Sequence, residues 1–413
     1  MGAADPIAPL AGVAVLELGN YIAAPTAGRL LADLGADVVK VERPGRGDER
    51  RGWRLHGGDT SMLFRTINRN KRSIVMDLRS DLARETLLAM LPRIDVVIEN
   101  FRPGTLETWG LGPQVLDAVN PGIVLARVSA FGQTGPMAGR PGFAAVAEAF
   151  GGFRELVGDP DRAPVRVGVS IGDTIAGIYA AFGVVMSLYE QGRVGRIPLQ
   201  RRTIDVALHE AMFSVMESLI PEYSAYGIQR HRTGGRMEGI APSNAYVCGD
   251  GASIVIGGNA DTNFARYMAV IGRPDLAADP RLATNAGRWE RRDELDAAIG
   301  AWTSRRSSTQ ALEILEASDI PAGPILRASD ILTDPHYAAR AMIQPFDVSD
   351  GAQTLRDVAF PGVTPVIGAA SLPVRSLGPD LGEHAEQILS DYLDLPPEEA
   401  RRLADRLAGR PPV

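Results

Sequence analysis

Cysteine is the scarcest residue in this sequence. A single cysteine, Cys248, occurs among 413 residues, and this excludes an internal disulfide framework and a metal site built on cysteine. No two of the five histidines have metal-ligand spacing, so we expect no bound metal. No G-x-G-x-x-G motif follows the first predicted strand, which leaves a dinucleotide-binding site without support.

Signals for export and for membranes are also missing. The N-terminal residues contain no basic region followed by an apolar one, and no apolar run reaches membrane-spanning length. The net charge of −7 argues against a general nucleic-acid-binding protein. We therefore expect a cytoplasmic protein without a membrane or nucleic-acid partner.

The first half of the chain alternates between predicted strands and helices. Residues 13–18 read as a buried strand, 26–34 as a helix and 37–42 as the next strand, which is the length of a parallel crossover unit. Further strands are predicted at 74–78, 95–99 and 123–129. This alternation is typical of a doubly wound α/β sheet, with ligand loops after the strands that end at 42, 99 and 129.

One of these loops, residues 43–52, is polar and rich in glycine and arginine. It follows the carboxyl end of the second strand, the edge at which open α/β sheets bind ligands. A solvated, charged loop is the other interpretation.

A second, smaller domain is predicted in the middle of the chain. After a linker at 229–239, hairpin-like strands at 245–247 and 253–256 are followed by three helices. This change of pattern predicts a small α+β domain at residues 229–330.

The segment 165–192 has the pattern of a strand end, a Gly172-Asp173-Thr174 step and an apolar helix from Ile175 to Gly192. Asp173 then stands at the expected N-cap, where backbone N–H groups and the helix dipole favour a carboxylate. It is therefore either a plain cap or a nucleophile, and the local pattern alone favours the cap.

Eight short motifs occur in the order of one known family and span nearly the whole chain. They are Leu10–Val13, Leu30–Glu42, Asn70–Ser73, Glu99–Gly104, Gly132–Pro136, Gly172-Asp173, Ile320–Pro324 and Leu381–His384. In these motifs the chain resembles the class III CoA-transferases, which include formyl-CoA and carnitine-CoA transferases. Asp173 matches the nucleophilic aspartate of that family, so the resemblance favours the nucleophile over the cap.

The resemblance implies a Rossmann-like, doubly wound large domain at 1–228 and 331–413, the small domain between them, and an interlocked homodimer with CoA between the domains. The positions that match CoA-contacting residues of the family are Asn20, Arg43, Lys71, Asn100, Phe101 and Phe131. Arg43, Lys71 and Arg72 are cations suited to nucleotide phosphates, although each is also consistent with a surface charge. Phe101 offers an apolar or stacking face to adenine.

The implied reaction moves CoA from an acyl-CoA donor, with succinyl-CoA a candidate, to a carboxylic or dicarboxylic acid. It proceeds through an aspartyl anhydride and an aspartyl-CoA thioester on Asp173, with CoA thioesters as substrates and no permanently bound cofactor. Backbone N–H groups at Gly257 and Gly258, or at the start of the Asp173 helix, are candidate oxyanion donors. The glycine pair is equally consistent with an ordinary turn.

Two alternatives stay open: an α-methylacyl-CoA racemase and a non-enzymatic CoA-binding protein. A racemase of this kind needs a histidine in the middle of the chain, and none occurs between Gly57 and Leu208. An intact Gly172-Asp173 site argues against the non-enzymatic protein.

The acceptor acid also stays open. Asn20 and Gly257–Asn259 depart from the family and bear on the acceptor, whereas the departure at Gly195–Gln200 affects a surface turn. The stretch Ile240–Asn244 is most similar to members that move CoA between succinate and other dicarboxylates. Three arginines are candidates to hold a second carboxylate: Arg140, Arg166 and Arg236.

Overall fold

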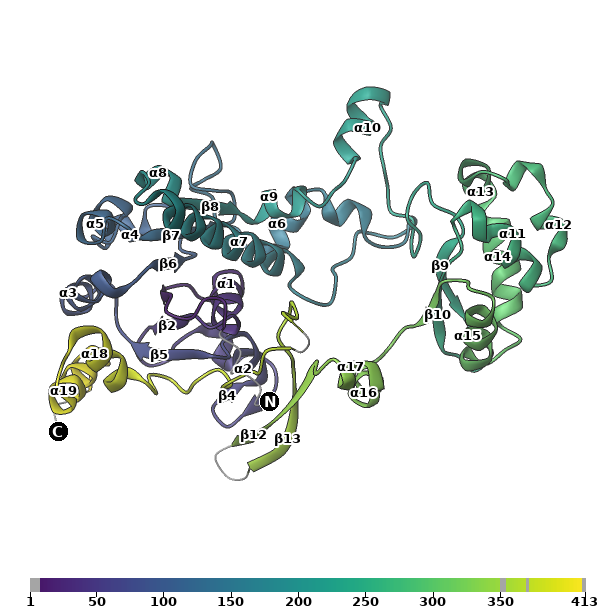
Figure 1. The fold of residues 1–413 in the computed structure, drawn as a ribbon. Helices are drawn as coiled ribbons and strands as arrows, with labels where there is room; N and C mark the ends of the chain where they lie inside the picture. The colour runs from purple at the N-terminus through teal and green to yellow at the C-terminus, as the bar shows by residue number, and fades with distance from the viewer. Residues whose placement is uncertain (1–7, 350–353, 369–370, 411–413) are drawn as a thin grey trace. The chain divides into compact units, whose positions relative to one another are not determined.

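The structure is a computed structural model that describes residues 8–349, 354–368 and 371–410 (Figure 1). The chain forms two compact units. The first unit consists of Met1–Phe153, Val167–Glu217 and Pro335–Val413, and the second of Arg154–Arg166 and Ser218–Asp334. The sequence places the small domain at residues 229–330, whereas the second unit also contains 154–166, 218–228 and 331–334.

The first unit contains a six-stranded sheet whose strands are all parallel. In spatial order the strands are β5 (Lys71–Val75), β2 (Asp37–Glu42), β1 (Ala14–Glu17), β6 (Val96–Glu99), β7 (Val124–Ser129) and β8 (Thr203–Ala207). The chain runs outward from β1 in one direction through β2 and β5, and then outward in the other direction from β6. The neighbours β1 and β6 therefore flank the switch point, and open α/β sheets bind ligands beyond the carboxyl ends of such strands.

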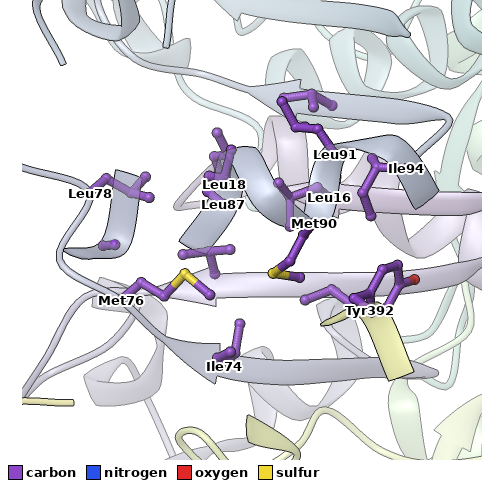
Figure 2. Packing of buried hydrophobic residues seen from close by; sticks show 14 of the residues in the cluster. Leu16, Leu18, Ile74, Met76, Leu78, Leu87, Met90, Leu91, Ile94 and Tyr392 are labelled. Atoms are coloured by element: carbon purple, nitrogen blue, oxygen red, sulfur yellow. The ribbon is translucent and has the colours of Figure 1, made fainter. Parts of the chain in front are cut away.

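Helices cover both faces of this sheet because alternate residues of each buried strand point to opposite sides. In β1, Leu16 packs into a cluster with helices α3 (Asp81–Met90) and α18 (Ala385–Leu393), part of which is drawn in Figure 2. Val15, its neighbour, packs on the other face with α1 (Ala23–Asp33) and α7 (Ile171–Val194).

The second unit has a small antiparallel sheet, β11–β10–β9, formed by Ala322–Pro324, Ser253–Gly257 and Ser243–Val247. Three helices pack on it around a separate core: α11 (Asp261–Val270), α14 (Arg292–Thr303) and α15 (Ser308–Ala317). Each unit therefore has its own hydrophobic core, as expected for two domains.

Both units contain further elements. In the first unit they are η1 (Glu49–Gly52), β3 (His56–Gly57), β4 (Thr60–Ser61), α2 (Met62–Ile67), η2 (Leu91–Arg93), α4 (Thr105–Thr108), α5 (Pro113–Val119), α6 (Ala144–Phe150), α8 (Leu199–Arg202), α9 (Leu208–Phe213), α17 (Pro335–Ala339), β12 (Ile343–Ser349), β13 (Thr354–Pro361) and α19 (Pro397–Leu407). In the second unit they are α10 (Leu219–Tyr226), α12 (Pro274–Ala277), η4 (Pro280–Leu282), α13 (Asn285–Glu290) and α16 (Ala328–Thr333). The short helix η3 (Phe153–Leu156) spans the division between the units.

The structure corrects the expectation of a strand before Asp173. Residues 163–170 form no strand, and helix α7 begins at Ile171, so Ser170 is the N-cap and Asp173 lies in the first turn. The apolar alternation of 165–169 misled the prediction, because Val165 and Val169 are exposed.

Helix α7 also corrects the expectation that no apolar run reaches membrane-spanning length. In the part of the chain that the structure describes, α7 alone is long and apolar enough to cross a membrane, with a mean hydropathy of 1.6 over its best window. Length and composition do not separate a membrane span from a core helix. Within this unit one face of α7 packs against α1 and the sheet.

Candidate active site

Two cavities lie at the carboxyl ends of the strands and share Phe101 as a lining residue. The first, of about 380 Å³, is lined by Asp173 and Asn100 among others. The second, of about 280 Å³, is lined by Asn20 and Arg43. All of these residues belong to the first unit, and Asn20 and Asn100 follow the switch-point strands β1 and β6.

The side chain of Asn100 ties the ends of these two strands together. Its Oδ1 accepts a hydrogen bond from the backbone N–H of Asn20 at 2.8 Å, and its Nδ2 donates to the Asn20 carbonyl at 2.7 Å. A side-chain amide is suited to this pairing because it carries both a donor and an acceptor. The structure thus brings these two predicted residues together, with their shared contact setting the shape of the crevice.

Glu99, the last residue of β6, positions the next residue along the chain. One oxygen of the buried Glu99 carboxyl accepts the Phe101 N–H at 2.6 Å, and the other accepts from Arg127 Nε at 2.7 Å. Burial raises the pKa of Glu99 to about 7, and Arg127 opposes this shift. The ring of Phe101 rests edge-on against Trp109, with ring centroids 4.9 Å apart.

Asp173 lines the first cavity from the first turn of α7. The partial positive charge of a helix N-terminus stabilises a carboxylate at this position. The preceding residue, Gly172, lies against Glu148: its N–H points at Glu148 Oε1 at 3.4 Å, and a Cβ there would come within 3.1 Å of that side chain. Close packing at Gly172 therefore fixes the start of the helix and the place of Asp173.

Arg43 lies in the loop after β2 and lines the second cavity. Its side chain is 51% exposed and forms an ion pair with Glu49 at 2.7 Å. Arg79 lines the same cavity and pairs with Asp77 at 2.8 Å. The exposed pair of Arg43 is weak in water, so its guanidinium can exchange Glu49 for another anion at little cost.

Lys71 does not fit the predicted phosphate contact. Its side chain has no exposed surface, and its ammonium donates to Glu17 at 2.7 Å, Pro25 O at 2.8 Å and Asn68 Oδ1 at 2.8 Å. These bonds use all three donors of the group. The sequence misplaced Lys71 because it begins strand β5 rather than preceding it, and its side chain points into the core.

The buried Lys71 belongs to a network under the crevice. Glu17 also accepts from Lys40 at 3.0 Å, and Lys40 pairs with Asp48 at 2.9 Å. Burial lowers the pKa of Lys71 to about 8, with Glu17 acting in the opposite direction. Burial also acts to lower the pKa of Lys40, but the carboxylates of Asp48 and Glu17 outweigh burial, so the pKa of Lys40 is raised.

Arg72 and Phe131 do not line either cavity. Arg72 donates to Asp37 at 3.0 Å and to Asp391 at 2.6 Å, and Asp37 begins β2 at the edge of the sheet opposite to the cavities. Phe131 is buried and lies against His209 in a tilted arrangement, with ring centroids 5.6 Å apart. The carboxylate partners of Arg72 argue against the phosphate contact predicted for it, and the CoA contact predicted for Phe131 stays a prediction.

Gly257 and Gly258 do not offer vacant N–H groups. Gly257 N donates to the Pro321 carbonyl at 2.8 Å, and Gly258 N donates to the Pro242 carbonyl at 3.0 Å. The prediction that they serve as oxyanion donors therefore conflicts with their bonding. Gly258 is required for packing instead, because a Cβ there would come within 2.3 Å of the Tyr267 ring.

Of the arginines proposed to clamp a second carboxylate, Arg140 lines the first cavity together with Arg102. Arg236 lies in the second unit and is held by Asp293 and Asp296, each at 2.7 Å. Arg236 is therefore already neutralised within its own unit, whereas Arg140 shares a cavity with Asp173.

Sequence reasoning missed Tyr21 and Arg50. Tyr21 lines the first cavity with a φ of 67°, a left-handed conformation that costs a bulky residue about 1–2 kcal/mol. Asp48 supports it by accepting its N–H at 3.3 Å. The sequence marks loop 43–52 as a candidate ligand loop, but it contains no signal that singles out Arg50 from its arginine neighbours.

Across the described ranges, no three His, Cys, Asp or Glu side chains cluster as metal ligands would.

A model of CoA-transferase family III matches residues 10–385 of the chain. The chain belongs to CoA-transferase family III. The resemblance seen in the motifs is therefore confirmed, and the protein is a CoA-transferase.

Two relatives come from Chloroflexus aurantiacus. Its succinyl-CoA–D-citramalate CoA-transferase is 42% identical to this CoA-transferase over 98% of each chain. The beta subunit of its succinyl-CoA–L-malate CoA-transferase is 36% identical, covering 96% of this chain and 97% of its own. Among solved structures, a CaiB/BaiF family protein from Brucella suis has a TM-score of 0.80 with 33% identity, covering 93% of this chain and 99% of that one. The α/β fold with a parallel central sheet is confirmed.

Proposed function

We propose that this CoA-transferase moves CoA from succinyl-CoA to a short dicarboxylic acid, with Asp173 as the nucleophile. The observation that carries this proposal is the position of Asp173 in the first turn of α7, on the wall of a cavity at the switch point of the sheet. A carboxylate in that position meets the donor thioester where α/β folds bind their ligands.

In the proposed reaction, one Asp173 oxygen attacks the thioester carbonyl, and the C–S bond breaks to give a mixed anhydride and CoA thiolate. The thiolate attacks the aspartyl carbonyl of the anhydride and releases the donor acid as a carboxylate. This leaves an aspartyl-CoA thioester. The acceptor carboxylate then attacks this thioester, and the same steps run in reverse to give the new acyl-CoA. Each step exchanges one leaving group for another, so no proton or electron donor is needed.

The two cavities support a route for CoA within the first unit. Arg43 and Arg79 place guanidinium groups on the second cavity, where they suit the nucleotide phosphates. Phe101 lines both cavities, so the pantetheine arm passes its ring on the way to Asp173. Asn20 and Asn100, locked together by two hydrogen bonds, hold the crevice open between the two strand ends.

Two observations support a dicarboxylic acid as the acceptor. Several relatives are named for dicarboxylic acids: D-citramalate, L-malate, glutarate and mesaconate. Arg102 and Arg140 line the cavity of Asp173, and an arginine fork suits the second carboxylate that such acids carry. A monocarboxylic acid would leave these cations without that partner.

We also propose that the enzyme is a homodimer. One face of α7 carries large apolar side chains that are exposed in the single chain: Ile178, Phe182, Met186 and Tyr189. Their spacing places them on one side of the helix, opposite the face that packs on α1. A continuous apolar face of this kind is typical of a protein interface, and a second copy of the chain is the partner that the family resemblance implies.

The substrate assignment is tested by incubating the enzyme with succinyl-CoA or acetyl-CoA and a panel of acids, and by identifying the new CoA thioesters. We expect succinyl-CoA to be the better donor and acids with two carboxylates to be the better acceptors. Efficient transfer to formate, with no transfer to citramalate, malate, mesaconate or glutarate, would contradict the dicarboxylate proposal.

A further inference from the structure

Arg50 is a buried cation with an incomplete set of partners. The residue is 5% exposed, and its Nε and Nη1 are buried with no hydrogen-bond partner in the described parts of the chain. An unsatisfied polar atom in the interior costs about 1–3 kcal/mol, and more when the group is charged. A ligand that accepts hydrogen bonds from Nε and Nη1 would complete the bonding of this group.

The backbone of Arg50 is held firmly. Asp48 accepts the Arg50 N–H at 2.9 Å, and its other oxygen pairs with the buried Lys40 at 2.9 Å. Because Lys40 has no exposed surface, Asp48 is itself fixed. The short helix η1 that carries Arg50 therefore starts from a rigid, charge-balanced point.

The side chain of Arg50 lies next to Tyr21, which forms part of the wall of the first cavity. Its guanidinium carbon lies 3.4 Å from the centroid of the Trp53 ring and 5.3 Å from that of Tyr21, a lining residue of the cavity. Burial lowers the pKa of Arg50, and the charge that most strongly opposes this is the Asp173 carboxylate. The contact with Tyr21, which shares a cavity with Asp173, and this electrostatic effect together place Arg50 near the proposed nucleophile.

The contrast with Arg51 is informative. Arg51 donates to both oxygens of Glu42, at 2.8 and 2.7 Å, and also to Thr60 and the Pro379 carbonyl. Each of its three guanidinium nitrogens therefore has a partner in the fold, so its role is to hold the loop on β2. Arg50, the adjacent residue, has no such internal partner for Nε or Nη1.

The proposed reaction creates a need for a fixed cation at this place. When Asp173 becomes an anhydride or a thioester it loses its negative charge, and a carboxylate is released from the donor acid in the same cavity. Arg50 would otherwise lose the strongest of its counter-charges in a site of low dielectric.

We propose that Arg50 is the residue that binds the reacting carboxylate of the acid substrate. It pairs with Asp173 in the resting enzyme and with the leaving or entering acid while Asp173 is joined to CoA. The charge around Arg50 then stays balanced throughout the cycle. This inference rests on the proposed function and adds a specific site for the acid.

The exchange of labelled succinate into succinyl-CoA tests this inference, because it follows the acid half of the reaction without a second acid. We expect Arg50→Gln to raise the KM for succinate at least about tenfold, while the KM for succinyl-CoA changes by less than about threefold. Arg50→Lys should recover part of the loss, because it restores the charge without the fork. In Arg50→Ala, added methylguanidinium should restore exchange, which a merely structural role would not predict.

Arg54→Gln is the matched control, since it removes an exposed arginine charge from the same stretch. Equal rises in the KM for succinate in Arg50→Gln and Arg54→Gln would overturn the inference, because they would indicate a general charge effect. An unchanged KM for succinate in Arg50→Gln would overturn it as well.

Folding and function are separated by two further measurements. If Arg50→Gln does not fold, a succinate KM in the folded Arg50→Lys variant within about twofold of wild type would overturn the inference. If the wild-type enzyme shows no succinate exchange, the proposed donor fails and the inference falls with it. If the wild-type enzyme exchanges succinate and the Arg50 variant has the wild-type KM for succinate, only the role of Arg50 is refuted and the proposed function stands.

Discussion

At the scale of single residues, the enzyme separates cations that hold the fold from cations that face the substrate. Lys71 and Arg51 have buried partners in the fold, whereas Arg43 is exposed on a cavity wall. Cations that stabilise the fold and cations that face the substrate therefore lie close together in the sequence, because the same strands and loops build the core and the site. The predictions for these residues therefore differ in what they should change.

We expect Lys71→Ala to act on stability. Removing the ammonium leaves Glu17 buried with one partner fewer, a change that typically costs 3–5 kcal/mol. Urea denaturation should show a large fall in the free energy of unfolding. If the Lys71→Ala enzyme is as stable as wild type and its only defect is a raised KM for CoA thioesters, the result would instead support a contact between Lys71 and a phosphate of CoA.

Arg43→Ala should act on binding. The side chain is half exposed and its pair with Glu49 is worth little, so we expect a free energy of unfolding within about 0.5 kcal/mol of wild type. The KM for CoA thioesters should rise more than kcat falls, as expected for contacts shared by ground and transition states. A normal KM for CoA thioesters in Arg43→Ala would remove this residue from the proposed phosphate site.

Glu99 gives a prediction about pH. Its folded pKa of about 7 lies above the ordinary value of 4.5, so between these two pH values the folded state binds more protons than the unfolded state. The contribution of Glu99 to stability is therefore fully present below about pH 4.5 and is lost as the pH rises through about 7. Glu99→Gln removes this titration. The difference in unfolding free energy between wild type and Glu99→Gln should shift against the wild type from pH 4.5 to 7, and a pH-independent difference would contradict the raised pKa.

At the scale of elements, helix α7 carries the site at one end and packs through small residues along one face. A Cβ at Gly177 would come within 2.7 Å of the Ala23 carbonyl and 2.8 Å of Thr26 on helix α1. A Cβ at Gly192, on the same helix, would meet nothing within 4 Å. Close approach of α1 and α7 therefore depends on the first glycine and not on the second.

We expect Gly177→Ala to lower the free energy of unfolding by about 1–3 kcal/mol, because the added methyl group has no space. Gly192→Ala should be neutral or stabilising by up to about 1 kcal/mol, because alanine favours a helix over glycine. Denaturation followed by circular dichroism compares the two. Equal effects of the two substitutions would show that the contact between α1 and α7 does not limit stability.

Prediction from the sequence was best where the physics is local. Four of the six strands of the sheet, β1, β2, β6 and β7, and the helix after Asp173 follow from apolar periodicity, whereas β5 begins three residues before its predicted start. The ligand edge follows from strand alternation. Three features could not be predicted without the tertiary structure. They are the inward direction of the Lys71 side chain, the bonded N–H groups of Gly257 and Gly258, and the buried Arg50 nitrogens that have no hydrogen-bond partner. Each depends on which partners surround a side chain or an amide, and one sequence does not specify these.

At the scale of the whole molecule, the exposed apolar face of α7 is the feature that needs a partner. We expect sedimentation over a wide dilution series to give one species of about twice the 44.0 kDa chain mass. Phe182 is 59% exposed in the single chain, so Phe182→Glu should disrupt the dimer, whereas Val115→Glu on helix α5 should not. A wild-type enzyme that sediments as a folded monomer at low concentration would contradict an obligate dimer.

The covalent role of Asp173 is the centre of the account, and one measurement tests it most directly. The enzyme is mixed with succinyl-CoA, the reaction is quenched, the protein is digested, and the masses of the peptides are measured by mass spectrometry. We predict an adduct of CoA, less one water, on the peptide that contains Asp173, and no adduct in Asp173→Asn, which retains its fold. An adduct on another residue, or transfer by Asp173→Asn within about tenfold of wild type, a barrier change of only about 1.4 kcal/mol, would contradict the account.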